Sequence, residues 1–382
     1  MLPLNESMKR IVVTGADGLL GWHARAHLHA ANCAARFRSL REPFDIIPLG
    51  KNSFNDDDEL EAALTDADAV LHFAGVNRAS DQEIEEGNPG IAKRLVSFCR
   101  KIGNTPHIVY ANSTHAVTDT PYGRSKKNAG EILSGISNRY TQLVLPHIFG
   151  ECARPYYNNV TATFIDQLRQ GVEVTVNPEG SVDLLHAGKV AQLALEAVEA
   201  SQFDTVKPKS TTMSVLELYQ KLDGFHRQYE ENIFPSLATD FDVKLFNAYR
   251  AATYPDNWPR PLTLSSDDRG ILFEAVKGGS GGQTFLSTTR PGITRGDHFH
   301  LHKVERFLVV KGEAIIRIRK VLTDTVWEYR VSGENPAPVD MPSLHTHSIE
   351  NVGDAELITA FWTNEMFDPN NPDTYADKVV KQ

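Results

Sequence analysis

Three histidines and one glutamate in the C-terminal part of the chain have the spacing of a metal-ligand set. His298 and His300 are separated by one residue, so in a β-strand both imidazoles would point to the same side. Glu305 follows after a short turn, and His347 would arrive from a later strand. Three imidazoles and one carboxylate suit a divalent first-row metal and leave positions for water or substrate. The sequence therefore predicts a metal site made of these four residues.

A second set of residues, in the N-terminal half, could transfer a proton. Tyr122 and Lys126 are four residues apart and would share one face of a helix. A nearby ammonium ion favours the phenolate, so we expect Lys126 to lower the pKa of Tyr122 and let it donate a proton near neutral pH. Ser113, just after a predicted strand, could hydrogen-bond the carbonyl being reduced, and Thr114 competes with it for that role.

A third feature is a glycine turn of the form Gly-x-x-Gly-x-x-Gly, near the N-terminus. Gly15 would allow the tight turn, Gly18 the approach of backbone to a pyrophosphate, and Gly21 the close packing of helix on strand. The N–H groups at the start of the following helix would then face the phosphates. This turn predicts a dinucleotide site.

The elements that must position these residues differ between the two halves of the chain. Up to about residue 250, apolar strand-like runs alternate with helix-like segments, which predicts a doubly wound parallel sheet with helices on both faces. The expected strands are Ile11–Thr14, Ile46–Leu49, Ala69–Phe73, His107–Tyr110 and Gln142–Leu145. The expected helices are Leu19–Ala30, Glu59–Leu64, Ile91–Cys99, Ser125–Leu133, Lys189–Ala200 and Val215–Phe225.

The proline-rich segment Tyr254–Pro261 is the expected linker, because its prolines favour an extended path. After it, short β-rich runs follow at close spacing and predict an all-β barrel or sandwich. These runs are Ile271–Val276, Thr284–Thr288, Glu305–Val310, Ala314–Arg319, Val326–Val331 and Leu357–Trp362. We expect three parts: residues 8–253, a linker at 254–261, and residues 262–382.

Composition restricts the class of protein. The chain has 382 residues, of which 41% are hydrophobic, and a net charge of −10, which disfavours nonspecific binding to nucleic acid or to anionic membranes. The three cysteines have no metal or redox spacing and suit a reducing compartment. No apolar run reaches the length of a membrane span, and no signal peptide is recognisable, so we expect a cytoplasmic protein.

The N-terminal part resembles the extended short-chain dehydrogenase/reductase family. The resemblance rests on the segments Gly15–Gly21, Val70–Gly75, Ser113, Tyr122–Lys126 and Pro146–Gly150. It implies hydride transfer between a nicotinamide and a sugar carbon, with Tyr122 as acid/base, Lys126 holding the ribose and Ser113 orienting the carbonyl. The cofactor-binding residues it implies are Gly15, Asp17, Gly18, Leu19, Leu20, Gly21, Lys51, Ala74, Gly75 and Lys126.

Several positions in this part bear on the ligands. The family often has an acid after the second strand, whereas this chain has Lys51, so a 2′-phosphate would meet a cation and NADPH is expected over NADH. The alternative is that Lys51 is simply a solvated turn residue. Arg154 could meet a diphosphate or be a surface charge. Asn158–Val160 and His186 lie where relatives often contact the nucleotide sugar, although either could be structural.

The C-terminal part resembles the cupin family, because the four predicted ligands stand in its two motifs together with Gly292, Gly312, Pro342 and Asn351. One departure is Leu344, where the second motif usually has glycine. The order of the two parts is similar to that of CapF-type capsular polysaccharide biosynthesis enzymes. That resemblance implies a UDP-linked 2-acetamido-2,6-dideoxy-4-ketohexose as substrate, C3 epimerisation in a zinc-binding cupin, and reduction at C4 by NADPH toward UDP-N-acetyl-L-fucosamine.

Alternatives remain open. The metal could be structural and the chain only a 4-keto reductase, or the cupin could be a sugar-sensing or dimerising module. The residues do not identify the epimerisation base, for which His302, Lys303 and His345 are candidates. By analogy with both families, a homodimer is expected.

Overall fold

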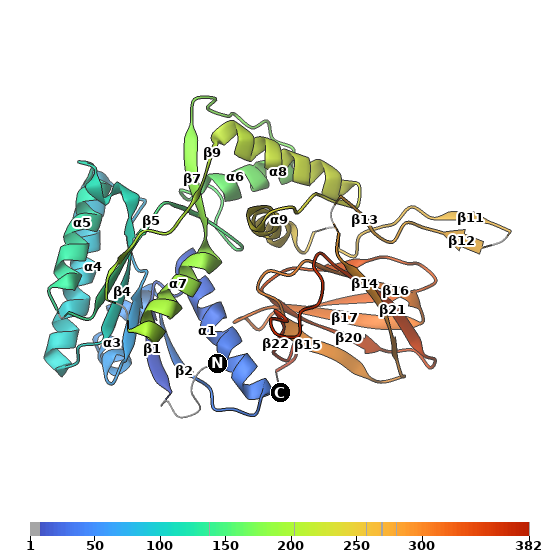
Figure 1. Cartoon of the computed structure of the whole chain (residues 1–382), viewed down its shortest axis with the longest axis horizontal. Coiled ribbons are helices and arrows are strands. Elements are labelled where there is room, and N and C mark those ends of the chain that lie inside the picture. The colour runs from blue at the N-terminus through green and yellow to red at the C-terminus, as the bar shows by residue number, and fades with distance from the viewer. Residues whose placement is uncertain are drawn as a thin grey trace. The chain divides into compact units, whose positions relative to one another are not determined.

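The computed structural model describes residues 8–136, 138–201, 203–256, 258–268, 270–279 and 281–381 (Figure 1). The chain forms two compact units. The first contains the chain up to Val160 together with Ser181–Ser214, and the second contains Thr161–Gly180 and the chain from Val215 onward. In the described residues, no helix combines the length and the hydropathy needed to cross a membrane.

The first unit is built on a six-stranded parallel sheet of order β2-β1-β3-β4-β5-β8. Its strands contain all five predicted runs, each with small differences at the ends. They are β1 (Lys9–Thr14), β2 (Phe44–Leu49), β3 (Ala69–His72), β4 (His107–Ser113), β5 (Tyr140–Leu145) and β8 (Thr205–Val206). A smaller sheet has the order β6-β7-β9, made of β6 (His147–Phe149), β7 (Ser181–His186) and β9 (Thr211–Ser214).

Helices cover both faces of the six-stranded sheet, which confirms the doubly wound architecture (Figure 1). Alternate strand residues explain the two layers: Val13 packs with one set of helices and Val12 with the other. The first face carries α1 (Leu19–Phe37) and α7 (Ala187–Ala200). The second carries α2 (Lys51–Asn55), α3 (Asp57–Leu64), α4 (Asp81–Ile102) and α5 (Pro121–Ser134).

The strand order reverses direction between β1 and β3, since β1 is followed in the chain by β2 on one side and by β3 on the other. In open α/β sheets, ligands bind beyond the carboxyl ends of the strands at such a point. The glycine turn follows β1, Ala74 and Gly75 follow β3, and Ser113 ends β4. The sheet therefore gathers these predicted residues along one edge.

The barrel of the second unit consists of two larger antiparallel sheets, which confirms the predicted all-β barrel. The first has the order β14 (Gln283–Thr289), β21 (Leu357–Thr363), β16 (Glu305–Lys311) and β19 (Val339–Met341). The second has the order β18 (Val326–Ser332), β17 (Glu313–Lys320), β20 (His345–Asn351), β15 (Thr294–Phe299) and β22 (Tyr375–Ala376).

One predicted strand, Ile271–Val276, does not form as a single element. Its start lies in β12 (Gly270–Leu272), which pairs only with β11 (Ser265–Asp267). The chain then leaves the strand conformation and returns to it at β13 (Lys277–Gly278), which pairs with β10 (Ile233–Phe234). Two different pairing partners divide the run.

Three helices belong to the second unit together with the barrel. They are α6 (Val160–Gln170), α8 (Val215–Glu230) and α9 (Asp240–Thr253), and only the first residue of α6 is grouped with the first unit. The expected boundary after residue 253 rests on the proline-rich segment and on the change to short β-rich runs, and it stays a prediction. The expected linker is packed, since Trp258 Nε1 donates to the carbonyl of Asp340 at 2.9 Å. Within that segment, Asn257 lies outside the described residues.

A buried ion pair ties these helices to the barrel. Arg306 on β16 donates to both carboxylate oxygens of Asp340 on β19, at 2.6 and 2.9 Å, and both side chains are fully buried. The hydroxyl of Tyr229 on α8 donates to the same carboxylate. Although burial opposes it, Arg306 holds the pKa of Asp340 below its usual value. The packing of α8 on the barrel thus depends on one shared carboxylate.

We expect Asp340→Ala to destabilise the second unit by about 3–5 kcal/mol, because it leaves the Arg306 guanidinium buried without a counter-ion. Glu313→Ala breaks only the exposed pair with Arg330 and should cost at most about 1 kcal/mol. Urea unfolding followed by tryptophan fluorescence measures both, because Trp258, Trp327 and Trp362 lie in this unit. Equal midpoints for the two variants would contradict the prediction.

Candidate functional site

The glycine turn is held against the end of β3. Gly15 has φ +64°, and a Cβ there would lie 2.8 Å from the backbone nitrogen of Ala74. A Cβ on Gly21 would lie 2.1 Å from the carbonyl oxygen of Gly15, so the turn cannot close with a larger residue at either position. The Ala74 N–H donates to Thr14 Oγ1 at 3.2 Å. The structure therefore brings the predicted turn and the Ala74–Gly75 segment together.

The start of α1 is open to a ligand. Its N-cap residue, Gly18, has no side chain to bind the first N–H groups, which belong to Leu19 and Leu20 in the first turn. Such unpaired N–H groups carry partial positive charge and suit a phosphate.

A cavity of about 400 Å³ lies beside this turn and is lined by residues from three segments: Asp17, Arg25, Pro48, Gly50, Lys51, Asn52 and Ser53. Lys51 begins α2, with its side chain exposed. Arg25 was not predicted. Its guanidinium donates to the Ala16 carbonyl at 3.2 Å and lies 3.7 Å from Asp17, and burial lowers its pKa. One turn of helix separates Arg25 from Gly21, a spacing that could have drawn attention to it.

Ser113 and Tyr122 meet at the end of β4. Ser113 Oγ accepts the N–H of His115 at 3.1 Å, and the Ser113 side chain lowers the pKa of the nearby Tyr122 phenol. Tyr122 is the second residue of α5, a helix that begins with Pro121 and is N-capped by Thr120. Thr114, the alternative to Ser113, is exposed in the short 3₁₀ turn Thr114–Val117.

Lys126 lies one helical turn beyond Tyr122 and is buried. Its Nζ donates to the carbonyl of Ala111 at 2.6 Å and lies 4.3 Å from the centre of the Tyr110 ring. Burial lowers its pKa to about 7. Burial also raises the pKa of Tyr122, against a smaller lowering by Ser113. The expected lowering by Lys126 is therefore wrong for this structure, because burial is the largest cause of the shift and Lys126 is not among its causes.

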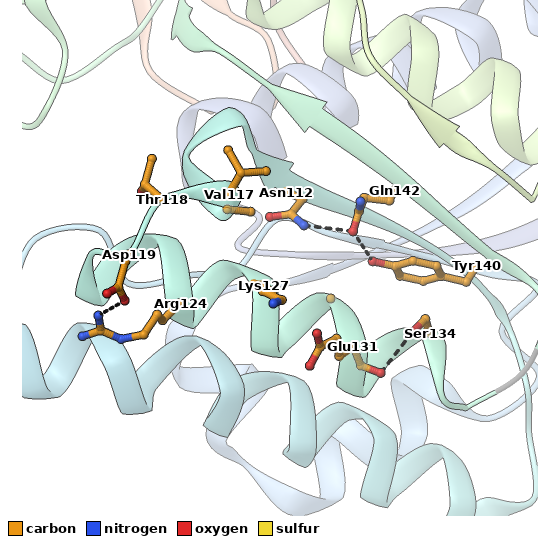
Figure 2. Close-up of a pocket in the computed structure, with 12 residues that line it drawn as sticks. Asn112, Val117, Thr118, Asp119, Arg124, Lys127, Glu131, Ser134, Tyr140 and Gln142 are labelled. Atoms are coloured by element: carbon orange, nitrogen blue, oxygen red, sulfur yellow. Dashed lines mark hydrogen bonds and ion pairs between the residues drawn. The ribbon is translucent and has the colours of Figure 1, made fainter.

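The end of β4 is braced by side chains of β4 and β5. Asn112 accepts the N–H of Ser113 at 2.8 Å and donates to Gln142 at 2.9 Å, and Tyr140 donates to the same Gln142 oxygen (Figure 2). These side chains line a cavity of about 730 Å³ beside α5. None of the predicted site residues lines it, although Asn112 positions the backbone of Ser113.

His186 is not available to a substrate. It is buried, its Nε2 lies 2.8 Å from the Glu151 carboxylate, and its Nδ1 accepts the N–H of Gly188. Burial disfavours the charged carboxylate, yet His186 and His23 hold the pKa of Glu151 at about 2. This buried cluster packs the end of β7 against α1.

The four predicted ligands of the second unit come together. His298 and His347 are paired across β15 and β20, Glu305 begins β16 of the other sheet, and His300 follows β15. One ligand atom from each residue lies within 4.8 Å of the others. His300 Nε2 is 3.0 Å and His347 Nε2 3.4 Å from the same Glu305 oxygen.

The outer nitrogens of two ligands are fixed by carbonyl groups. His300 Nδ1 donates to Asp373 at 2.5 Å and His347 Nδ1 to His345 at 3.1 Å, so both Nε2 lone pairs face the cluster. His347 Nε2 is buried and makes no hydrogen bond to the described residues. Burial alone would raise the pKa of Glu305, but His300 and His347 hold it well below its usual value. An ionised carboxylate with imidazole lone pairs fits a divalent cation.

Sequence reasoning missed Asp373. Its buried carboxylate accepts the backbone N–H groups of Leu301, His302 and Lys303 at 2.9, 3.0 and 2.9 Å, and so holds the turn between His300 and Glu305. The next residues form β22, which pairs with β15 at His298. No local pattern in the sequence connects this segment with the histidines.

Comparisons with known proteins agree with both units. The "NAD dependent epimerase/dehydratase family" profile matches residues 11–207, and the "Polysaccharide biosynthesis C-terminal domain" profile matches residues 265–375. The chain is 29% identical over 379 residues to a UDP-2-acetamido-2,6-beta-L-arabino-hexul-4-ose reductase of Pseudomonas aeruginosa, covering 97% of this chain and 99% of the relative.

Two solved structures are also similar. The capsular polysaccharide assembling protein CapF from Staphylococcus aureus is 33% identical with a TM-score of 0.60, over 97% of this chain and 100% of that chain. A CapF structure with the inhibitor 3-isopropenyl-tropolone is 30% identical with a TM-score of 0.54, at the same coverage. The expected Rossmann-like and cupin-like folds are thereby confirmed. The chain belongs to the NAD-dependent epimerase/dehydratase family, as a CapF-type member that carries the polysaccharide biosynthesis C-terminal domain.

Proposed function

We propose that this protein inverts C3 of a UDP-linked 2-acetamido-2,6-dideoxy-4-ketohexose in its barrel and then reduces C4 with NADPH, toward UDP-N-acetyl-L-fucosamine for capsular or surface polysaccharide. The observation that carries the proposal is the presence of two complete side-chain sets in one chain. These are Ser113, Tyr122 and Lys126 beside the dinucleotide turn, and the cluster of His298, His300, Glu305 and His347. A relative similar over nearly its full length is named as a reductase of such a sugar.

The reductase chemistry needs a proton donor beside a carbonyl. NADPH supplies the hydride to C4 of the sugar. Tyr122 donates its phenolic proton to the carbonyl oxygen, and its raised pKa keeps that proton in place until the reaction. Ser113, which lowers the pKa of Tyr122, orients the same oxygen. Lys126 binds the cofactor ribose and helps return a proton to Tyr122.

The barrel chemistry uses the acidity of the C3–H bond next to the C4 ketone. A divalent metal, with zinc expected, held by the four clustered side chains would stabilise negative charge on the ketone oxygen as a Lewis acid. A base removes the C3 proton and the opposite face is reprotonated. Lys303 and His345 are buried, whereas the His302 side chain is 42% exposed and 3.2 Å from Asp373, so the geometry favours His302. Reduction then removes the ketone that makes epimerisation reversible.

NADPH is the proposed cofactor because the cavity beside the glycine turn contains two cations. Lys51 and Arg25 both line it, and the acid that would bind a free 2′-hydroxyl group after β2 is absent from residues 49–53. Asp17, the carboxylate in the same cavity, is 3.7 Å from Arg25 and leaves Lys51 to a phosphate.

A second candidate function is 4-keto reduction alone, with a structural or sugar-sensing barrel. The observation that favours it is the name of the Pseudomonas aeruginosa relative, which describes a reductase only. The homodimeric state and the cytoplasmic location expected above stay predictions.

Tyr122→Phe should lower NADPH oxidation by about 10²–10⁴-fold, because only the proton donor is lost. Binding of NADPH, measured by its fluorescence, should remain near the parent value. Tyr219→Phe, which removes a hydroxyl on α8 in the second unit, serves as the control and should turn over normally. Normal turnover by Tyr122→Phe would exclude Tyr122 from the reaction.

We expect the parent protein to bind NADPH more tightly than NADH. Lys51→Ala and Arg25→Ala should each reduce the ratio of the two affinities about tenfold, since each variant removes a charged hydrogen bond to the 2′-phosphate. Titration by cofactor fluorescence measures both constants. Lys93→Ala, an exposed lysine on α4, should change neither constant. Equal affinities of the parent for the two cofactors would show that these cations do not select the phosphate.

Substituting His298 or His347 by alanine should release bound metal and abolish deuterium incorporation at C3 in heavy water without NADPH, because each loses one donor. Both variants should still reduce the already epimerised ketone. His29→Ala, in the first unit, should retain metal and exchange. Metal content and NMR provide the readouts.

Asp373→Asn should weaken metal binding while every ligand side chain remains, because the turn after His300 loses a charged acceptor. The metal that each variant retains in the presence of a chelator measures this effect. Asp368→Asn, which changes an exposed carboxylate, is the control and should retain metal as the parent does. Metal-free parent protein that exchanges the C3 proton at the full rate would contradict the Lewis-acid role. No exchange by any form would favour the second candidate function.

A further inference from the structure

Helix α9 reaches the turn that joins two of the predicted metal ligands. We call Leu301–Val304 the ligand turn, because His300 precedes it and Glu305 follows it. Asn247 on α9 is buried, with 1% of its surface exposed, and its Nδ2 donates to the carbonyl of His302 in this turn at 2.6 Å. The segment that carries two ligands and the favoured base is therefore bonded to a helix outside the barrel.

The amide of Asn247 is itself held in place. Its Oδ1 accepts a hydrogen bond from Arg250 Nη1, one turn further along α9, at 3.4 Å. Arg250 is fully buried, and its Nη2 donates to the carbonyl of Met341 at the end of β19, at 2.5 Å. Because the amide oxygen faces the guanidinium, the two N–H donors of Asn247 point the other way, toward the ligand turn. The bond to His302 thus has a fixed direction.

The ligand turn is held by both acceptors and a donor. Asp373 accepts three of its backbone N–H groups, and Asn364 Oδ1 accepts the N–H of Val304 at 2.9 Å. Asn247 supplies the donor for the His302 carbonyl. In the part of the chain that the structure describes, it is the only side chain of a helix that hydrogen-bonds to this turn. Without it, the carbonyl would lose that donor while every predicted ligand stayed present.

Helix α9 can act as a fixed support because it is fastened to α8. Lys221 Nζ donates to the Asp242 carboxylate at 2.7 Å. His226 Nδ1 lies 2.9 Å from the hydroxyl of Tyr249. Helix α8 is in turn joined to the barrel by the buried carboxylate described above. Neither family profile covers these two helices, since the profiles match residues 11–207 and 265–375.

We propose that Asn247 is a positioning residue of the metal site, so that α9 serves the chemistry of the barrel although it precedes the barrel in the chain. By holding the His302 carbonyl, Asn247 fixes the segment between His300 and Glu305. The inference rests on the proposed function, which supplies the metal and the exchange at C3. Asn247 contributes no metal ligand, so it acts on metal affinity and on C3 exchange through the ligand turn, and it leaves reduction unchanged.

Two substitutions of similar size test the bond. Asn247→Leu removes the donor, and Asn247→Asp places a carboxylate oxygen against the His302 carbonyl. Both should weaken zinc binding about tenfold or more, measured by competition with a chelator. The visible spectrum of the cobalt-substituted protein, which reports ligand geometry, should shift in both variants. With metal saturating, deuterium incorporation at C3 should fall about tenfold, whereas reduction of the already epimerised ketone should stay within about twofold of the parent.

Asn232 provides the matched control in the same unit. Its amide also accepts from an arginine, Arg260, at 2.9 Å and donates to a backbone carbonyl, that of Pro261, at 2.8 Å. Asn232→Leu and Asn232→Asp should lower the urea midpoint at least as much as the Asn247 variants. They should nevertheless keep the zinc affinity, the cobalt spectrum and the exchange rate of the parent.

The outcomes separate this inference from the function on which it rests. Zinc affinity, cobalt spectrum and exchange rate unchanged in both Asn247 variants overturn the positioning role alone. Equal losses in the Asn232 variants also overturn it, because general destabilisation would then explain the effect. A parent protein that binds no zinc, or that exchanges no C3 proton in any form, overturns the proposed epimerisation and this inference together.

Discussion

Neighbouring residues of a β-strand point to opposite faces, and both units depend on this constraint. In the first unit it separates Val12 from Val13 and so creates two hydrophobic layers, one on each side of the parallel sheet. In the second unit it separates Glu305 from Arg306. The carboxylate of Glu305 faces the histidines, and the guanidinium of Arg306 pairs with Asp340 beneath α8. Strand β16 therefore carries a predicted metal ligand and a residue of the buried ion pair in adjacent positions.

The buried ionisable side chains of the two units have different surroundings. Lys126 lies beside a carbonyl oxygen and an aromatic ring, and burial lowers its pKa. Glu305 is equally buried, but imidazoles surround it. They lower its pKa, so the carboxylate stays ionised. The first arrangement makes a cation easy to neutralise, and the second preserves an anion. Both suit the chemistry proposed for each place.

The sequence predicted those parts of the sites in which the residues are close in the chain or stand at the ends of recognisable elements. The glycine turn, the Tyr122–Lys126 pair and the His298–His300 pair depend on local geometry, and the alternation of strands and helices placed them on the right elements. Arg25 and Asp373 were not found, since their importance comes from contacts with segments far away in the sequence. The pKa of Tyr122 was misjudged because burial, which no local pattern reports, raises it.

The turn that carries His300 is completed by a carboxylate that comes later in the chain than any of the four clustered side chains. During synthesis, His298, His300, Glu305 and His347 therefore leave the ribosome before Asp373 does. At that stage the chain would have all four donors but would lack the carboxylate that fixes the turn after His300. The arrangement of the proposed metal site is thus completed only when the segment just before β22 has emerged.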